Sequence, residues 1–292
     1  MILGTIVKGI GGFYYIDTEN GIIECKARGH FRSKNMSPCV GDKVYITLNG
    51  DNTGNIDKIL PRNNHFIRPP VSNIEELIVV ASVQNPSPDL TFIDKMLSIA
   101  YKSRVDVKLC FNKIDLDDGN LNEIVDVYNR AGYTTIITST VNDTGIEQIR
   151  SLVKGKVTAF SGFSGVGKSS LLNAVTQNSI METGEVSERL KRGKHTTRHV
   201  ELIKFNGGYI VDTPGFSMLD FPDSFTKEDL KECFPEFNDY EDLCRFRDCN
   251  HTGDSKICAV CKAAEDGNIA LSRYNNYKSF FASLSKRKEW KK

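Results

Sequence analysis

The strongest constraint on the fold of this chain is a nine-residue stretch, GFSGVGKSS, at residues 162–170. It satisfies the pattern G-x-x-x-x-G-K-[ST], in which a glycine-rich turn joins a strand to a helix. The apolar run KVTAFSG precedes it, and the helical run SSLLNAVTQ follows. In such a turn the backbone N–H groups converge on phosphate oxygens, and the helix adds the positive end of its dipole. The stretch therefore predicts a phosphate-binding loop, and the flanking strand and helix argue against a plain glycine-rich turn.

Each residue of this loop is a candidate nucleotide contact: Gly162, Phe163, Ser164, Gly165, Val166, Gly167, Lys168, Ser169 and Ser170. Lys168 has the position that reaches the β and γ phosphates of a nucleotide. The Ser169 hydroxyl has the position that holds Mg²⁺.

A base-reading motif lies about 50 residues earlier, in the stretch FNKIDLDD at 111–118. Asn112, Lys113, Ile114 and Asp115 fit the pattern N-K-x-D. The aspartate can accept two hydrogen bonds from the ring N–H and the exocyclic amine of guanine. Adenine offers no such pair, so an adenine nucleotide would leave the carboxylate unpaired. Ser139, in the stretch ITST, resembles the serine loop that supports guanine from the other side.

A third motif, VDTPG at 211–215, follows the phosphate loop. Asp212 is expected to approach Mg²⁺, and the N–H of Gly215 to sense the γ-phosphate in a switch segment that hydrolysis releases. The intervening run RGKHTTRHV supplies two candidates for the switch threonine, Thr196 and Thr197, and the sequence does not choose between them.

The residue that orients the attacking water is a further question. Many GTPases place a glutamine after D-x-x-G, but this chain has Phe216 there, which cannot form a hydrogen bond. His195, beside the switch threonines, is the candidate for this role. The alternative is a histidine that faces solvent or a partner.

The order of these motifs is base-reading, serine loop, phosphate loop, switch threonine, D-x-x-G, which is a circular permutation of the usual GTPase order. A permutation is physically allowed because domain termini often lie close together. Strands and helices alternate from about residue 74, which predicts a doubly wound α/β sheet with its ligand at the carboxyl ends of the strands. Two other functions agree less well with these motifs. A nucleotide kinase does not need the guanine-reading pattern N-K-x-D. An RNA-binding scaffold with a vestigial nucleotide pocket does not need Lys168, Ser169 and Asp212.

The regions before and after the α/β segment have different predicted secondary structure. Residues 1–68 read as five short strands with Gly, Asn and Asp turns, which match an OB-like barrel, although another small β domain remains an alternative. FIRPPVSN at 66–73 reads as a linker, because Pro69 and Pro70 interrupt regular structure. Beyond Phe221 the chain is expected to be helical. Its last helix carries a core-facing stripe of apolar residues, namely Tyr274, Tyr277, Phe281 and Leu284.

Eight cysteines are present, and four of them fall close together in the C-terminal region. Cys244, Cys249, His251 and Cys258 form a spacing typical of a closed tetrahedral structural Zn²⁺ site. Cys261 is a spare thiol that could replace His251 as the fourth ligand. A scattered set of the other cysteines fits a reducing compartment better than a disulfide framework.

Composition adds three expectations. The 292 residues include 39% hydrophobic and 26% charged residues, with a formal net charge of +1, as in a soluble globular protein. The sequence contains no run of about 18 apolar residues, so we expect no membrane span. The N-terminus lacks the features of a secretory leader, so we expect no secretion signal. The basic runs ERLKRGKHTTRHV and KRKEWKK suit phosphate contacts, but each can also be a solvated surface.

The motifs and their order resemble the RsgA (YjeQ/YloQ) family of circularly permuted GTPases that depend on the small ribosomal subunit. The resemblance spans nearly the whole chain and rests on NKID, GFSGVGKSS, RGKHTTRHV, DTPGF and the cysteine–histidine knuckle. It implies an OB-fold domain at 1–68, a permuted GTPase domain at 69–221 and a helical zinc domain at 222–292.

The same resemblance implies GTP hydrolysis to GDP with Mg²⁺, stimulation by the small (30S) subunit late in its assembly, and binding to 16S rRNA. It implies a cytoplasmic protein, for which we expect a monomer and no membrane partner. A histidine at the position of His195 has been considered catalytic in the family, whereas Cys261 lies outside the family pattern.

Overall fold

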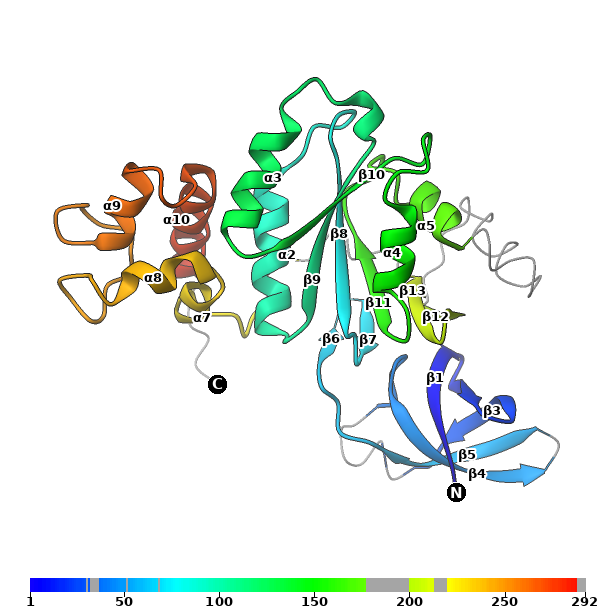
Figure 1. Ribbon diagram of the computed structural model, residues 1–292. Helices are drawn as coiled ribbons and strands as arrows, with labels where there is room; N and C mark the ends of the chain where they lie inside the picture. The colour runs from blue at the N-terminus through cyan, green and yellow to red at the C-terminus, as the bar shows by residue number, and fades with distance from the viewer. Residues whose placement is uncertain are drawn as a thin grey trace.

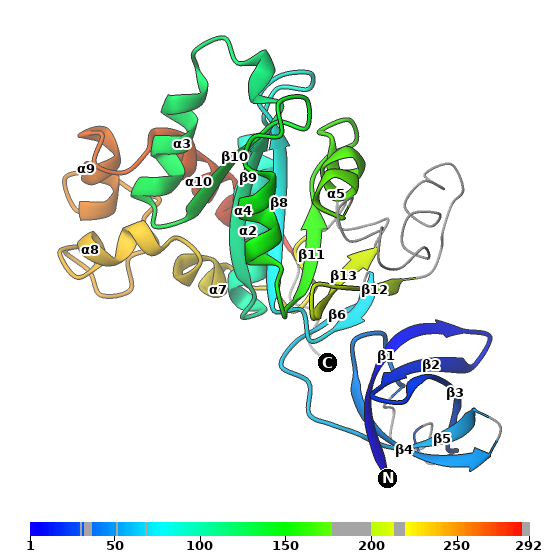
Figure 2. The ribbon, with the colours of Figure 1, turned by 45° about the vertical axis from the view of Figure 1, so that its right-hand side comes forward.

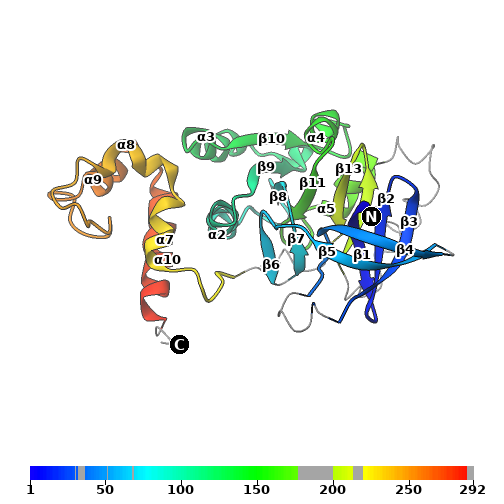
Figure 3. The same cartoon turned by 90° about the horizontal axis from the view of Figure 1, so that it is seen from below.

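The computed structural model describes residues 1–29, 31, 37–50, 52–67, 69–176, 200–212 and 220–287. These form an N-terminal barrel, a central sheet covered by helices, and a C-terminal group of helices (Figure 1). Seen from below, the barrel and the C-terminal helices lie on opposite sides of the central sheet (Figure 3).

The described residues of the N-terminal barrel form five strands, as the sequence predicts. They are β1 (Ile2–Ile10), β2 (Phe13–Thr18), β3 (Gly21–Ala27), β4 (Lys43–Gly50) and β5 (Thr53–Ile59). The strand order is β1-β2-β3-β5-β4, and β4 pairs back with β1 to close the barrel. Alternate residues point inward, so Ile6, Ile16, Ile46 and Ile56 have no exposed surface. The architecture is that of a five-stranded OB-type barrel.

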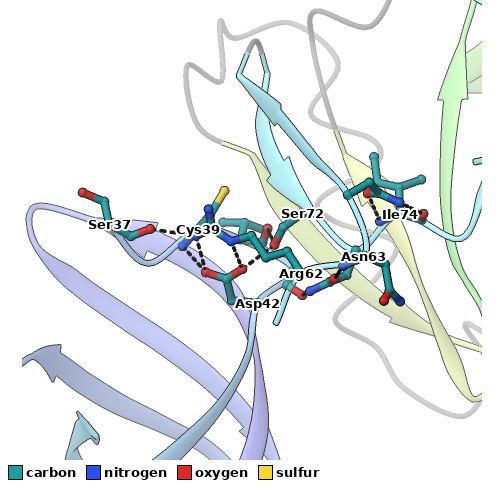
Figure 4. A network of polar contacts seen from close by, with 11 residues as sticks. Ser37, Cys39, Asp42, Arg62, Asn63, Ser72 and Ile74 are labelled. Atoms are coloured by element: carbon teal, nitrogen blue, oxygen red, sulfur yellow. Dashed lines mark hydrogen bonds and ion pairs between the residues drawn. The ribbon is translucent and has the colours of Figure 1, made fainter. Parts of the chain in front are cut away.

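A buried carboxylate fixes the segment that leaves the barrel (Figure 4). Asp42 has 0% exposed surface, and the Arg62 guanidinium donates to both of its oxygens at 2.7 Å. The Ser72 hydroxyl and the Cys39 N–H donate to the same carboxylate at 2.7 and 2.8 Å. A carboxylate paired this fully can be buried at low cost. The network therefore ties the linker to the barrel.

The linker was predicted to be irregular, but the structure shows regular pairing there. Residues on both sides of Pro69 pair as the short antiparallel strands β6 (His65–Ile67) and β7 (Pro70–Ser72). Pro70 can belong to a strand here because it begins the strand of a two-stranded sheet, a position that tolerates proline. The two prolines thus form part of a hairpin instead of ending regular structure.

The central sheet has the strand order β10-β9-β8-β11-β13-β12 (Figure 2). Its strands are β8 (Glu76–Ser82), β9 (Asp106–Asn112), β10 (Thr134–Thr138), β11 (Val157–Ser161), β12 (Glu201–Phe205) and β13 (Gly208–Asp212). All pairs are parallel except β12 with β13, which form the expected hairpin. All seven residues of β8 are buried, as expected for a strand covered on both faces.

Among the described residues, two helices cover each face of this sheet. They are α2 (Leu90–Lys102) and α3 (Leu121–Arg130) on one face, and α4 (Ile146–Leu152) and α5 (Lys168–Thr176) on the other. The strand residues divide accordingly: Ile78 and Val80 join the core under α4 and α5, whereas Leu77 and Val79 join the core under α2 and α3.

The barrel continues the central sheet. Strand β1 pairs with the edge strand β12, with Lys8 opposite Glu201. Asp17 of β2 accepts a hydrogen bond from the Tyr209 hydroxyl at 2.6 Å and pairs with Lys204 at 2.9 Å. The barrel is therefore attached to the strand hairpin that ends at Asp212.

The C-terminal region is helical, as predicted. It contains α7 (Lys227–Glu232), η3 (Pro235–Phe237), α8 (Asn238–Glu241), α9 (Ala259–Glu265) and α10 (Leu271–Lys286). Tyr274, Tyr277 and Leu284 of the expected core stripe of α10 are buried, whereas Phe281 is only partly buried and its neighbour Phe280 is buried. Among the described residues, none of the helices has the length and hydropathy needed to cross a membrane.

Candidate nucleotide site and metal centre

The predicted nucleotide-binding residues meet at the carboxyl ends of neighbouring parallel strands. The phosphate loop follows β11, N-K-x-D is at the end of β9, and Ser139 follows β10. Asp212 is the last residue of β13, and its side chain lies outside the described part of the structure. Because these strands are parallel, motifs far apart in the sequence lie at one edge of the sheet, where α/β proteins bind nucleotides.

Glycines give the phosphate loop its shape. Gly162 has a φ of 148°, and a Cβ built there would lie 2.2 Å from the backbone oxygen of Val80. Gly167 has a φ of 92°, and its added Cβ would lie 2.4 Å from Nδ2 of Asn112. An L side chain at either position would therefore be strained and would also collide with a neighbour. These are the two glycines that the sequence pattern requires.

The side chains of the loop that are predicted to contact phosphate lie at the start of α5. Lys168 is the first residue of that helix, and its ammonium donates to the carbonyl oxygens of Gly162 and Phe163. Burial lowers the pKa of Lys168 from its ordinary value. Ser169 and Ser170 follow in the first turn and are exposed. The helix start thus presents hydroxyls and backbone N–H groups where a phosphate can bind.

Asn112 joins the base-reading loop to the phosphate loop. It is 1% exposed, and its Nδ2 donates to the Val166 carbonyl at 2.9 Å. Its Oδ1 accepts from the Thr138 hydroxyl at 3.0 Å. Both ends of the amide are therefore used, and the loops after β9, β10 and β11 are held in one geometry.

The carboxylate of Asp115, which is predicted to read guanine, has a polar neighbour of its own. The Ser139 hydroxyl donates to Oδ1 of Asp115 at 2.5 Å. The same hydroxyl oxygen accepts from the N–H groups of Val141 and Asn142 at 3.2 and 3.3 Å. Asp115 itself is exposed. Ser139 thus orients an accessible carboxylate, which can receive the paired N–H donors of guanine.

Lys113 and Ile114 complete the base-reading motif. Lys113 adopts the left-handed backbone conformation with a φ of 64°, and its ammonium donates to the carbonyl oxygen of Asn85. Ile114 begins the short helix η1 (Ile114–Leu116) and packs against the core. The turn after β9 therefore projects Asp115 beyond the edge of the sheet.

Sequence reasoning missed two contributors to this geometry. Thr138 supports Asn112, and the loop after β8 supports Lys113 through the Asn85 carbonyl. The local sequence around them carries no distinctive pattern, because their partners come from other strands.

Several predicted residues fall outside the described part of the structure. They are His195, Thr196, Thr197 and Gly215, together with Phe216. Their roles in switching and in water orientation remain predictions.

The cysteine–histidine cluster comes together in the C-terminal helices. The ligand atoms of Cys244, Cys249, His251 and Cys258 all lie within 4.8 Å of one another. The Cys244 and Cys258 sulfurs are 3.8 Å apart, and each is 3.6 Å from Nδ1 of His251. A tetrahedron with zinc–sulfur bonds of about 2.3 Å has edges of about 3.8 Å. The cluster therefore fits one structural Zn²⁺ ion.

The surroundings of the cluster keep His251 in the form that binds a metal. Burial lowers its pKa to about 4, so the imidazole is neutral near pH 7. The Tyr274 hydroxyl donates to the His251 carbonyl at 3.0 Å, and Phe237 packs edge-on against the ring. Burial raises the pKa of the Cys258 thiol, so a bound cation is the natural partner of its thiolate.

Cys261 does not belong to this cluster. Its sulfur lies 2.8 Å from the Tyr274 hydroxyl and 3.5 Å from the carbonyl oxygens of His251 and Gly253. Its N–H donates to the Cys258 sulfur at 3.4 Å. The structure thus favours His251 over Cys261 as the fourth ligand and assigns Cys261 a supporting contact.

Together, the parallel sheet, the phosphate loop and the linked N-K-x-D loop define a P-loop GTPase whose motifs are circularly permuted. Comparison with known proteins agrees: the profile described as RsgA GTPase matches residues 59–222, and that of the RsgA N-terminal domain matches residues 3–56. The chain belongs to the RsgA GTPase family, and the predicted enzyme class, a GTP hydrolase, is confirmed.

Individual relatives cover nearly the full length. The chain is 46% identical over 275 residues to the small ribosomal subunit biogenesis GTPase RsgA of Clostridium novyi, covering 94% of each chain. The crystal structure of YjeQ from Thermotoga maritima is 36% identical, with a TM-score of 0.85 over 98% of this chain and 99% of that one. The circularly permuted GTPase YloQ is 32% identical, with a TM-score of 0.83 over 99% and 96%.

Proposed function

We propose that this protein hydrolyses GTP to GDP during assembly of the small ribosomal subunit and that binding to that subunit accelerates hydrolysis. The observation that carries the nucleotide assignment is the linkage of three loops: Asn112 ties the base-reading loop to Val166, and Ser139 orients Asp115. A nucleotide kinase would not need this guanine-reading arrangement. The relative from Clostridium novyi carries small ribosomal subunit biogenesis in its name.

The proposed binding roles follow from position. Asp115 pairs with the guanine edge, while Asn112, Lys113 and Ile114 hold the base-reading loop and Ser139 supports the carboxylate. The loop residues 162–170 surround the phosphates, and Lys168 leaves the carbonyls of its own loop to reach the β and γ phosphates.

The proposed metal and switch roles complete the site. Ser169 and Asp212 would hold Mg²⁺, with Thr196 or Thr197, and the ion would supply charge neutralisation of the phosphates. Gly215 would sense the γ-phosphate, and His195 would orient the attacking water, since Phe216 cannot.

The remaining regions supply partner contacts and stability. We place the OB-fold domain at 1–68, the GTPase domain at 69–221 and the zinc domain at 222–292, with one structural Zn²⁺ on Cys244, Cys249, His251 and Cys258. The barrel and the basic runs are proposed to contact 16S rRNA, mainly through its phosphates, so binding should weaken as salt rises. The protein is proposed to act as a cytoplasmic monomer.

GTP turnover by the purified protein, with and without purified small subunits, tests this proposal. We expect low intrinsic turnover, clear stimulation by the subunit, and no turnover by Lys168→Ala. Competition by excess ATP should leave the rate unchanged. Tight ATP binding, or turnover by Lys168→Ala equal to that of the wild type, would contradict the assignment.

A further inference from the structure

Helix α2 connects the C-terminal helices to the nucleotide site. One face of α2 packs on the central sheet through buried residues such as Met96 and Leu97. The opposite face carries a polar stripe at helical spacing that contacts the C-terminal region. Its side-chain contacts are Thr91 with Asn276, Asp94 with Arg273, and Lys102 with Asp229. Lys95 pairs with Asp220, just before the C-terminal region, and the Cys233 thiol donates to the backbone carbonyl of Ser98.

Arg273 of α10 is the buried centre of this interface. Its side chain is 1% exposed, and its Nη1 lies 2.6 Å from Oδ1 of Asp94, which is fully buried. Glu236 of η3 accepts from the other edge of the guanidinium. Tyr133 of the GTPase domain and Phe234 of the C-terminal region hold their rings 5.3 and 4.9 Å from the guanidinium carbon.

Such a cluster imposes a fixed geometry. A cation without exposure to water is tolerated only when its carboxylates are correctly placed, and removing one partner leaves an uncompensated charge. The ion pairs Lys95–Asp220 and Lys102–Asp229 are partly exposed, and pairs of that kind contribute little. The orientation of α2 against the C-terminal helices is therefore set mainly at Asp94.

The N-terminal end of α2 contacts the nucleotide loops. Phe92, two residues before Asp94, packs against Phe163 of the phosphate loop, with ring centroids 4.4 Å apart and ring planes tilted by 42°. Asp89 caps the helix by accepting from the Phe92 N–H at 2.9 Å. In the loop just before the helix, the Asn85 carbonyl accepts from Lys113 of the base-reading motif.

We propose that Asp94 and Arg273 act as positioning residues, through which the C-terminal domain fixes α2 and, through Phe92 and Phe163, the phosphate loop. This inference rests on the proposed nucleotide site and adds a regulatory input to it. A partner that shifts the C-terminal domain would change nucleotide affinity, and nucleotide would change affinity for that partner by the same factor.

Two near-isosteric variants separate positioning from simple stability. Asp94→Asn weakens the link between Arg273 and α2, whereas Glu236→Gln weakens the other carboxylate contact of the same guanidinium without touching α2. Both should lower the thermal midpoint. Only Asp94→Asn should weaken binding of a fluorescent GDP analogue, by about 2- to 30-fold, the range measured for coupling through packed networks.

A double-mutant cycle tests the route. Phe92→Leu removes the ring contact with Phe163, so adding Asp94→Asn to it should cost less affinity than Asp94→Asn does alone. Phe92→Leu combined with Glu236→Gln should be additive. If Asp94→Asn does not fold, Asn276→Ala replaces it, because Asn276 of α10 donates to Asp94 at 2.6 Å and bonds Thr91 at 3.0 Å.

The outcomes are distinct. Wild-type affinity in folded Asp94→Asn or Asn276→Ala, an equal loss in Glu236→Gln, or additivity with Phe92→Leu would overturn the positioning role. If the wild-type chain itself does not bind GDP, the proposed nucleotide site fails, and the inference fails with it.

Discussion

Replacement of Asn112 by alanine is the sharpest local perturbation of the nucleotide site. Asn112 is 1% exposed, and its side-chain amide donates a hydrogen bond to the Val166 carbonyl at 2.9 Å. Alanine removes this donor. A buried acceptor left without a partner costs about 1–3 kcal/mol. The Thr138 hydroxyl loses its hydrogen bond to Asn112 as well, but it retains its contact with the Cys110 sulfur at 3.3 Å. This second loss therefore adds little to the cost in stability.

The same change should weaken nucleotide binding. Asn112→Ala frees the phosphate loop from the base-reading loop, so a nucleotide that spans both must restore their alignment. If the lost 1–3 kcal/mol appears in binding, affinity for GDP falls by about 5- to 150-fold. Titration with a fluorescent GDP analogue measures this effect, and urea unfolding followed by circular dichroism compares the midpoints.

Thr138→Val is the matched control for Asn112→Ala. It deletes the hydroxyl that donates to Oδ1 of Asn112 but leaves the bond from Asn112 to Val166 intact. We expect a loss of about 1 kcal/mol in stability with nearly unchanged GDP affinity. An Asn112→Ala protein that binds GDP as tightly as the wild type would refute the view that this amide organises the site.

Three further predictions concern the base, the metal and pH. Asp115→Asn should lose most of its preference for guanine nucleotides, measured as GDP affinity against inosine diphosphate, because the wild-type carboxylate accepts from the guanine amine that inosine lacks; an unchanged ratio of the two affinities would exclude Asp115 from base reading. Cys244→Ser should reduce bound zinc well below one equivalent in elemental analysis and unfold the C-terminal helices, whereas Cys110→Ser, at a buried position on β9, should retain the metal; a full zinc equivalent in Cys244→Ser would remove it from the ligand set. Because the pKa of His251 is lowered from 6.5 to about 4 in the folded chain, the unfolded state binds the extra proton first, so stability should fall as pH decreases from 6.5 toward 4. A chromogenic chelator should detect zinc release over that range, and release that does not depend on pH there would contradict a neutral, buried His251.

Much of the architecture follows from local patterns. The apolar run of β8 and the helical spacing of α2 were sufficient to predict a covered parallel sheet, because strand and helix periodicities report burial directly. The glycines at 162 and 167 were sufficient to predict the phosphate loop, because the backbone at these two positions excludes a side chain. The barrel followed from five short strands separated by turn residues.

Other features depend on tertiary contacts that a single sequence does not reveal. Nothing local indicates that Asn112 reaches the Val166 carbonyl or that Arg273 pairs with Asp94, since the partners are 54 and 179 residues apart. The hairpin at Pro69 arises from pairing between two three-residue strands, where proline signals alone suggested an irregular linker. Cys261 could be separated from the metal ligands only once its contact with Tyr274 was visible.

We propose that the small ribosomal subunit stimulates this GTPase, and the most direct test is phosphate release from GTP by the wild-type protein with and without purified 30S particles. Lys168→Ala measured in parallel reports any contaminating activity, and 50S particles control for nonspecific effects of RNA. We expect 30S particles to raise the wild-type rate well above its intrinsic value, with no rise for 50S particles or for Lys168→Ala. Equal rates with and without 30S particles would contradict the proposed partner, and equal rates for wild type and Lys168→Ala would contradict the proposed site.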